Sequence, residues 1–216
     1  MLRSQNLRLI SQMSKNTKTT IAVRQVIDAL TLTEEMRAAR LKEEERLLPG
    51  QIPFAMNHII TLRNAGKDVF LGDPSIDPLE RFAGYKSTFH IDWAQRVIAG
   101  FKKVVADHKE IDFTPTGNPK SIKADVVGIE LRLNLESIAT LPDGTRLYLY
   151  YHVKSELDDF VRNLLLHGAK YVAELSHEQA EVAIVDAYNG RLIRLNDSAD
   201  GPFVEACVGR AAARYH

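Results

Sequence analysis

The sequence predicts an α+β fold, in which an antiparallel or mixed sheet of β-hairpins packs against one long core helix and follows a helical N-terminal region. Three observations support this prediction. Apolar residues recur at helical spacing through much of the first half of the chain. Apolar and polar residues then alternate strictly over residues 127–136, which is typical of a half-buried strand. Finally, Pro142-Asp143-Gly144 and Asn189-Gly190 are turn sequences of the kind that join hairpin strands.

Length and composition favour one globular domain. The 216 residues are enough for a single well-filled core, and 45% hydrophobic and 26% charged residues lie in the ordinary globular range. No apolar run approaches the roughly 20 residues of a membrane span. The one cysteine, Cys207, suits a reducing compartment. We expect a soluble intracellular protein with a flexible basic arm over residues 1–18 and one α+β domain over 19–216, helical over 19–110 and sheet-containing over 111–216.

The N-terminal segment has a charge that the whole chain lacks. The chain carries 28 basic and 28 acidic residues, yet residues 1–24 include five basic side chains and no acidic one. Such a segment is typical of a disordered arm that binds nucleic acid, of an organelle transit peptide, or of an extension before a start at Met13. These three interpretations stay open. We expect a cytoplasmic protein, with a mitochondrial one as the alternative.

Four helices are expected before the first hairpin. A short amphipathic helix runs from Thr19 to Leu30, and a highly charged helix over residues 33–48 pairs opposite charges one turn apart. A third stretch covers Ala55 to Asn64. The apolar stripe over Ile91 to Lys109 predicts the main core helix. The charged helix holds no sustained heptad, so a coiled coil is not indicated and the oligomeric state stays open.

The strongest pattern is a hairpin within residues 123–155. If Leu141 pairs with Thr145, the apolar faces of its two strands coincide. Asn134 then lies across from His152, and Arg132 across from Lys154. The other face gathers the polar and aromatic residues Glu130, Arg132, Asn134, Glu136, Tyr148, Tyr150, His152 and Lys154. This is either the solvent side of an antiparallel sheet or a functional surface.

Three elements complete the expected fold. A helix with an apolar inner side runs from Leu157 to Leu175. A second hairpin joins Glu181–Tyr188 to Arg191–Leu195 through the tight Asn189-Gly190 turn. A terminal helix over Phe203 to Tyr215 closes the domain.

The order helix, hairpin, helix, strand over about residues 90–195 resembles the core of the PD-(D/E)xK nuclease superfamily, especially its RecB-like branch. The resemblance implies that Glu136, or in second place Glu130, is the first metal-binding acid, and that His152-Val153-Lys154 takes the place of acid-x-Lys. It implies catalytic roles for Glu136, His152, Lys154 and Tyr171, and Mg²⁺ or Mn²⁺ held by Glu130, Glu136 and His152.

Two departures from that family alter the expectation. A histidine replaces the second acid, and imidazole is a poor ligand for Mg²⁺ although Mn²⁺ accepts it. Of the family's Gln-x-x-x-Tyr motif, only Tyr171 is present. The resemblance therefore implies an inactive or reassigned nuclease core.

Other chemical signatures are missing from the sequence. It contains no phosphate-binding P-loop, no Gly-x-Ser-x-Gly elbow and no Gly-x-Gly-x-x-Gly fingerprint. The seven histidines form no His-x-x-x-His pair, so a dedicated zinc site is not expected. His90 and Asp92 are either a metal pair or residues at a helix start, where Asp92 acts as a cap.

Three hypotheses for function follow. The first is a non-catalytic protein that binds a macromolecule, either a protein or a nucleic acid, through the polar hairpin face or residues 1–24. The second is a divalent-metal nuclease with a modified site, which requires Glu136 or Glu130 close to His152 and Lys154 on an open concave face. The third is a small-molecule-binding domain with a pocket between the sheet and the core helix. No cofactor is expected unless the nuclease hypothesis holds, and no membrane is expected as a partner.

Overall fold

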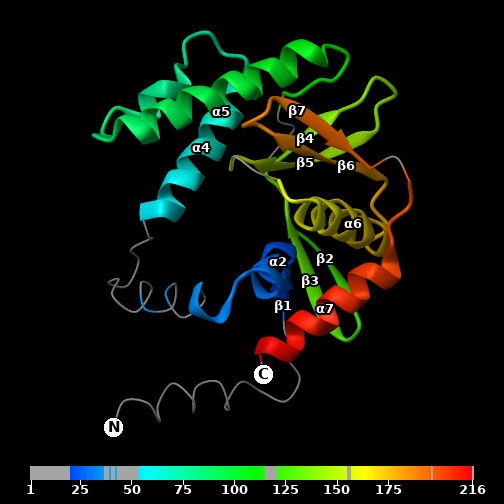
Figure 1. The fold of residues 1–216 in the computed structure, drawn as a ribbon. Coiled ribbons are helices and arrows are strands. Elements are labelled where there is room, and N and C mark those ends of the chain that lie inside the picture. Colours follow the sequence, from blue (N-terminus) through cyan, green and yellow to red (C-terminus); the bar gives the residue numbers. More distant parts are fainter. Residues whose placement is uncertain are drawn as a thin grey trace.

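The computed structural model describes residues 20–36, 39, 42, 54–114, 121–154, 157–195 and 197–215. Its helices and two mixed sheets confirm the predicted α+β class (Figure 1). The helices are α2 (Val23–Thr31), α4 (Phe54–Leu71), the 3-10 helix η1 (Pro78–Phe82), α5 (Thr88–Asp107), α6 (Asp159–Leu175) and α7 (Gly201–Tyr215). The strands are β1 (Thr20–Ala22), β2 (Ser121–Val126), β3 (Ile129–Asn134), β4 (Ser137–Thr140), β5 (Arg146–His152), β6 (Ala180–Asp186) and β7 (Arg191–Arg194).

The larger sheet has the strand order β4-β5-β6-β7. β4 and β5 form an antiparallel hairpin, and β6 and β7 form another. Between the hairpins, β5 and β6 run parallel, with His152 opposite Asp186. Parallel neighbours need a crossover connection, which α6 provides. This places the N-terminus of α6 beside the ends of β5 and β6.

The smaller sheet has the order β1-β3-β2. β2 and β3 form an antiparallel hairpin through Val127 and Gly128, whose φ angles are 46° and 81°. Two consecutive positive φ angles are the signature of the tight type I′ turn. β1 adds to β3 in parallel, pairing Ile21 with Leu131.

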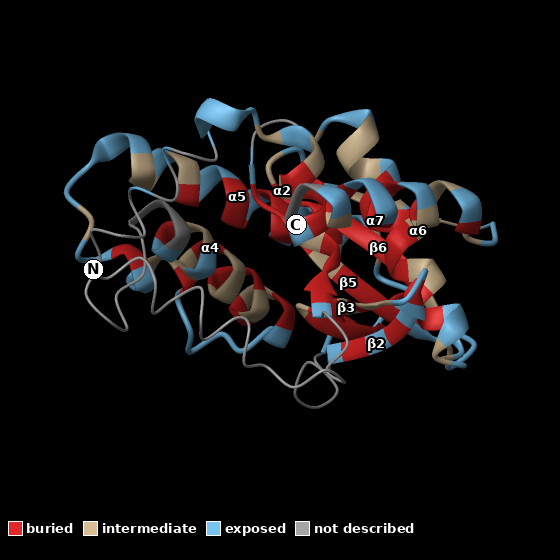
Figure 2. Ribbon diagram, turned by 90° about the horizontal axis from the view of Figure 1, so that it is seen from below, coloured by how far each residue is buried: buried red, intermediate tan, exposed pale blue. Residues whose placement is uncertain are grey.

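Two layers of helices cover the faces of the larger sheet. The side chains of Leu147, Leu149 and Tyr151 on β5 pack into one cluster with residues of α4 and α5. On the other face, Tyr148 and Ile184 pack with α6, α2 and α7. Figure 2 shows the buried residues in the strands and on the inward sides of these helices. Alternate residues of β5 therefore point to opposite faces of the sheet, and both faces are buried. Helix α6 covers the face that the sequence left open as a possible solvent side.

Most of the later elements agree with the sequence prediction. The core helix, the helix after the first hairpin, the second hairpin and the terminal helix correspond to α5, α6, β6–β7 and α7. The helix predicted at Ala55–Asn64 is longer, because α4 continues to Leu71. Most of the charged segment 33–48 lies outside the described residues.

The N-terminal helix begins later than predicted. Residues Thr20–Ala22 form strand β1, and the helix starts at Val23. The amide of Ala22 donates to Gln25 Oε1 at 2.8 Å, so the chain passes directly from strand to helix. Pairing with β3, more than 100 residues away, is a long-range effect that local helical spacing does not reveal.

The predicted register of the first hairpin is correct near its turn and wrong further from it. The amide of Leu141 donates to Thr145 O at 2.9 Å, and Ser137 pairs with Leu149, as the predicted register requires. However, Asn134 pairs with Ser121 instead of His152, and Arg132 pairs with Lys123 instead of Lys154. The chain changes sheets at residues 135–136, because β3 finds its partners in β1 and β2.

None of the helices in the described ranges combines the length and apolar character needed to cross a membrane.

Candidate anion-binding site at the end of β5

A pocket of about 180 Å³ lies where β5 ends. Four elements meet there: α2, α4, the last residues of β5, and the N-terminus of α6. The polar residues on its wall are Arg24, Asp28, Thr31, Arg63, Tyr150, His152, Lys154 and Asp158. The carboxyl ends of parallel strands, next to a helix N-terminus, are a common ligand position in α/β sheets. The fold therefore builds a polar pocket at a place suited to binding.

The N-terminus of α6 forms one side of this pocket. Asp158 caps the helix, and its Oδ1 accepts hydrogen bonds from the amides of Phe160 at 2.8 Å and Val161 at 3.2 Å. The carboxylate is thus occupied by backbone donors. Lys154 is exposed and lies four residues before this cap.

Arg63 of α4 contributes the most buried positive charge. Its Nη1 lies 2.7 Å from Glu136 Oε1, and both side chains are about 15% exposed, at 16% and 14%. Its Nη2 donates to the Tyr150 hydroxyl at 3.1 Å, and the guanidinium lies 5.3 Å from the centre of the Tyr150 ring. Arg63 therefore joins α4 to β5 through a hydrogen bond and a cation–π contact with Tyr150, and to the residue before β4 through the ion pair with Glu136.

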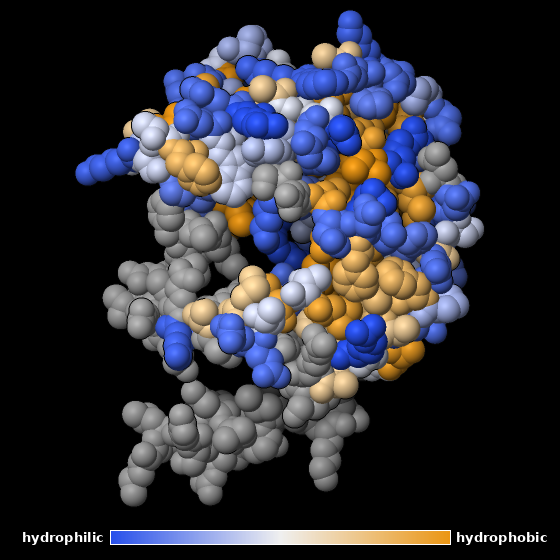
Figure 3. All heavy atoms as spheres, in the orientation of Figure 1, coloured by the Kyte–Doolittle hydropathy of each residue, from blue (hydrophilic) through white to orange (hydrophobic). Residues whose placement is uncertain are grey.

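The charges at the pocket are balanced. Arg24, Arg63 and Lys154 are cationic, whereas Asp28, Asp158 and the Glu136 that pairs with Arg63 are acidic. Figure 3 shows a hollow between α4 and α2 with hydrophilic residues along its inner wall. The positive end of the α6 dipole also faces the pocket and favours an anion there, and the Asp158 carboxylate already accepts two of its backbone amides.

Three predicted site residues lie at this end of β5, and two do not. His152 and Lys154 line the pocket, and Glu136 is bound to Arg63, which lines it too. Glu130 lies in the other sheet, where it pairs with Lys123 at 2.8 Å and accepts from Thr20. Tyr171 donates to Glu205 of α7 at 2.5 Å, and this hydrogen bond raises the pKa of the tyrosine.

The described residues do not assemble the expected metal-binding set. Within the described ranges, no group of three or more His, Cys, Asp or Glu side chains is placed to hold a metal ion. Glu136 faces a guanidinium at the position where the nuclease resemblance would put a cation. His90 packs against His58, with ring centres 4.8 Å apart, while Asp92 lines a separate pocket. His90 and Asp92 therefore do not form a site together.

Sequence reasoning missed Arg63 and Asp186, and it placed Arg24 only in the basic segment 1–24. Asp186 ends β6 opposite His152 and is 3% exposed. Its Oδ2 accepts from Asn189 Nδ2 at 2.9 Å, whereas Oδ1 has no hydrogen-bond partner in the described part of the chain. In the sequence, an acidic residue directly after the apolar run Val182–Val185 was a signal that could have indicated Asp186. Arg63 lies within a helical segment and gave none, whereas Arg24 was recognised only as part of the basic segment 1–24.

Comparisons with known proteins do not identify a family. No protein-family model matches the chain, and no curated protein matches it. One solved structure, described as the crystal structure of SSO0001, aligns with 98% of this chain and 83% of its own at a TM-score of 0.37 and 10% sequence identity. A similarity of that size carries no argument about fold or function.

Proposed function

We propose that this protein binds nucleic acid without cleaving it, by holding a backbone phosphate in the pocket at the end of β5. The observation that carries the proposal is the convergence of Arg24, Arg63 and Lys154, from three different elements, on one pocket at the N-terminus of α6. Phosphate oxygens accept hydrogen bonds from guanidinium and ammonium groups, and helix N-termini favour anions.

The size of the pocket favours part of a macromolecule over a whole small molecule. Pockets for drug-sized ligands and cofactors usually enclose about 300–1,000 Å³. A pocket of about 180 Å³ accepts one phosphate with part of its sugar. The rest of the ligand would extend over the surface, as a nucleic-acid strand does.

Two features favour binding over catalysis. The carboxylate of Glu136 is neutralised by Arg63, so it is not available to a metal ion unless that ion pair breaks. Helix α6 also packs against the face that carries Tyr148, which is 2% exposed, while Tyr150 on the same face lines the pocket at the end of β5. A hydrolytic metal site needs a set of hard oxygen ligands with an open position.

A metal-dependent nuclease is the second candidate. The observation in its favour is the order β4-β5-α6-β6, which brings Glu136, His152 and Lys154 to the same end of the sheet. Its chemistry would require the Arg63–Glu136 ion pair to open and a metal ion to bind in its place.

The test is fluorescence anisotropy with a labelled oligonucleotide of about 16 nucleotides. Lys154→Gln removes an exposed charge from the pocket and should weaken binding about tenfold, which corresponds to ~1.4 kcal/mol. Arg194→Gln is the matched control, because Arg194 pairs with Glu181 at the other end of the sheet. Equal affinities of the two variants, or no binding by the unmodified protein, would refute the proposal. Mn²⁺-dependent cleavage that Lys154→Gln abolishes would favour the nuclease instead.

A further inference from the structure

A second surface, lined by aromatic residues, adjoins the pocket. Phe89, Trp93 and Arg96 of α5, together with Tyr188 after β6, border a shallow depression of about 340 Å³ with Asp92 at its rim. We name Phe89, Trp93, Arg96 and Tyr188 the aromatic platform. Phe89 is 64% exposed, more than any other large hydrophobic residue in the described ranges.

The platform residues are arranged in two pairs. The Phe89 and Trp93 rings lie 5.7 Å apart at an interplanar angle of 68°. The Arg96 guanidinium lies 4.0 Å above the centre of the Tyr188 ring, and its Nε donates to Tyr188 O at 3.5 Å. The platform thus offers one exposed aromatic ring, that of Phe89, beside the half-buried Trp93 and a guanidinium stacked on the half-buried Tyr188.

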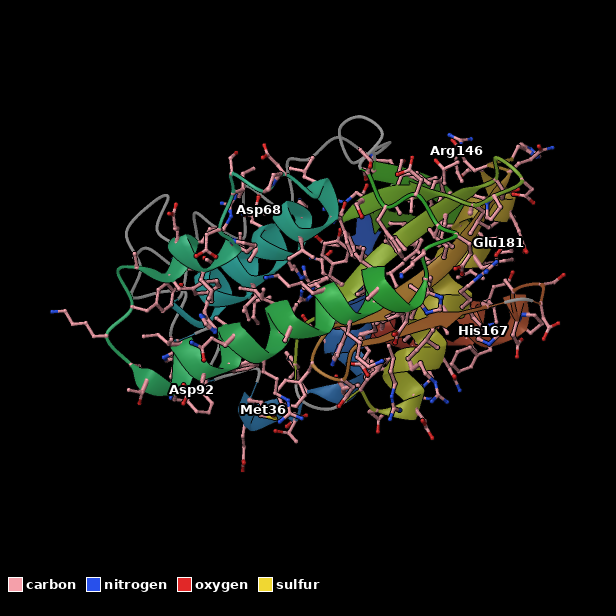
Figure 4. The ribbon with its side chains drawn as sticks, turned by 90° about the horizontal axis from the view of Figure 1, so that it is seen from above. Met36, Asp68, Asp92, Arg146, His167 and Glu181 are labelled. Carbon is pink, nitrogen blue, oxygen red and sulfur yellow. The ribbon has the colours of Figure 1, made fainter. Side chains whose placement is uncertain are left out.

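Hydrogen bonds connect the platform to the end of β5. Trp93 Nε1 donates to the carbonyl of Val153 at 2.9 Å, and Val153 stands between His152 and Lys154. The amide of Ala187, the residue before Tyr188, donates to His152 O at 2.9 Å. Figure 4 places Asp92 near the N-terminal end of α5, far from Arg146 and Glu181 at the other end of the sheet. The platform and the cationic pocket therefore flank the same end of β5.

These features match the requirements of single-stranded nucleic acid. A single strand presents phosphates to cationic groups and unstacked bases to aromatic and guanidinium planes. A duplex keeps the faces of its bases covered by their neighbours. Contiguous exposed apolar surface marks interaction sites, and the exposed Phe89 ring adjoins the Trp93 ring.

We propose that the aromatic platform stacks the bases of a single-stranded DNA or RNA whose phosphate is held in the pocket at the end of β5. This inference rests on the proposed function and names the form of nucleic acid that the site takes. Single-stranded DNA and RNA both present an unpaired base next to a backbone phosphate. Titration with a strand of each kind distinguishes deoxyribose from ribose.

Trp93 is the single tryptophan of the chain, so intrinsic fluorescence reports on the platform directly. The full chain is titrated with oligothymidylate and with oligouridylate of about 16 nucleotides, and in parallel with an abasic strand and a duplex of the same length. We expect at least one of the two ordinary single strands to quench Trp93 emission. The abasic strand should bind about tenfold more weakly and leave the emission unchanged. The single strand that binds more tightly shows whether the site prefers deoxyribose or ribose.

Phe89→Ala is the variant of choice, because an exposed side chain contributes little to folding. It should weaken oligonucleotide binding about tenfold and leave abasic-strand binding unaltered. Leu175→Ala, which truncates a 41% exposed leucine at the far end of α6, is the control and should change neither.

The outcomes separate this inference from the proposed function. If the ordinary, abasic and duplex strands bind equally and Trp93 emission does not change, base stacking is excluded while phosphate binding stands. The inference also fails if Phe89→Ala binds the oligonucleotide normally, and the platform would then face another kind of partner, such as a protein. If no strand binds, both the proposed function and this inference are overturned.

Discussion

His58 is a histidine buried among aromatic rings. It is 2% exposed, and neither ring nitrogen has a partner in the described part of the chain. The rings around it belong to Phe82, Tyr85, His90 and Trp93. Burial, and secondarily the charge of His90, lower the pKa of His58. The cluster joins α4, η1 and α5, so the charge state of His58 affects how these helices pack.

We predict that the free energy of unfolding decreases as the pH falls below about 6.5, the ordinary pKa of histidine in an unfolded chain. Because the pKa of His58 is lower in the folded protein, the unfolded chain binds the proton first, and acid favours unfolding. The contribution of the neutral His58 to the free energy of unfolding is therefore complete above about pH 6.5 and is lost as the pH falls below it. Urea unfolding at several pH values measures the effect.

A phenylalanine at position 58 provides the comparison. His58→Phe keeps a ring of similar shape and removes two unpaired nitrogens, so it should reduce this pH dependence and stabilise the acid form by about 1 kcal/mol. His177→Asn is the control, because His177 is exposed and asparagine tolerates its φ of 55°. Identical pH profiles for the unmodified protein and His58→Phe would contradict the assignment.

At the scale of elements, α5 lies against the turn after β6 with no room for a side chain at Gly100. A Cβ atom built on Gly100 would lie 1.6 Å from the carbonyl oxygen of Ala187, which is backbone and cannot move aside by changing rotamer. Helix and turn are therefore in direct backbone contact. This contact sets the distance between Trp93 and Arg96 on the helix and Tyr188 on the turn.

Gly100→Ala should destabilise the protein by about 3 kcal/mol or more, because α5 must move away from the sheet. The matched variant is Gly209→Ala in α7, where nothing lies within 4 Å of the added methyl group. Alanine should stabilise that exposed helical position by about 0.5–1 kcal/mol. Chemical denaturation compares the two variants. Similar effects of both would show that α5 does not touch the turn.

Local sequence signals explain which elements could be predicted. The helix α5 has an apolar stripe, and the turns at Asp143-Gly144 and Asn189-Gly190 fix their hairpins through residues only a few positions apart. Alternation also shows which face a strand residue occupies, but it does not identify the neighbouring strand. No glycine or proline marks the point after Asn134 where the chain changes sheets. The hairpin predicted from the sequence therefore extends too far.

The same limit applies to the candidate site. His152 and Lys154 were predicted to share one face because period-two alternation requires it. Arg63 reaches Glu136 across 73 residues of chain, and only the packing of α4 on β5 brings them together. The sequence therefore indicates the strand residues of the pocket and the basic segment that contains Arg24, but it does not indicate Arg63.

At the scale of the whole molecule, positive and negative charges cancel. The 28 basic and 28 acidic residues produce no net field, so attraction to phosphate must come from local groups. The groups described above are Arg24, Arg63 and Lys154 in the pocket and Arg96 on the aromatic platform. Arg63 is partly neutralised by Glu136. The slope of log K against log salt concentration therefore measures how many of these charges neutralise a phosphate.

We predict a slope of about −2 to −3 for log K against log salt concentration with a single strand, since each neutralised phosphate contributes about −0.7. Lys154→Gln should make the slope less steep by about 0.7, whereas Phe89→Ala should lower the affinity and leave the slope unchanged, because stacking releases no counterions. Anisotropy titrations over a range of salt concentrations measure both. A slope steeper than about −5 would require more cations than the pocket and platform supply, and the four basic side chains that precede Arg24 would then be the first source to test.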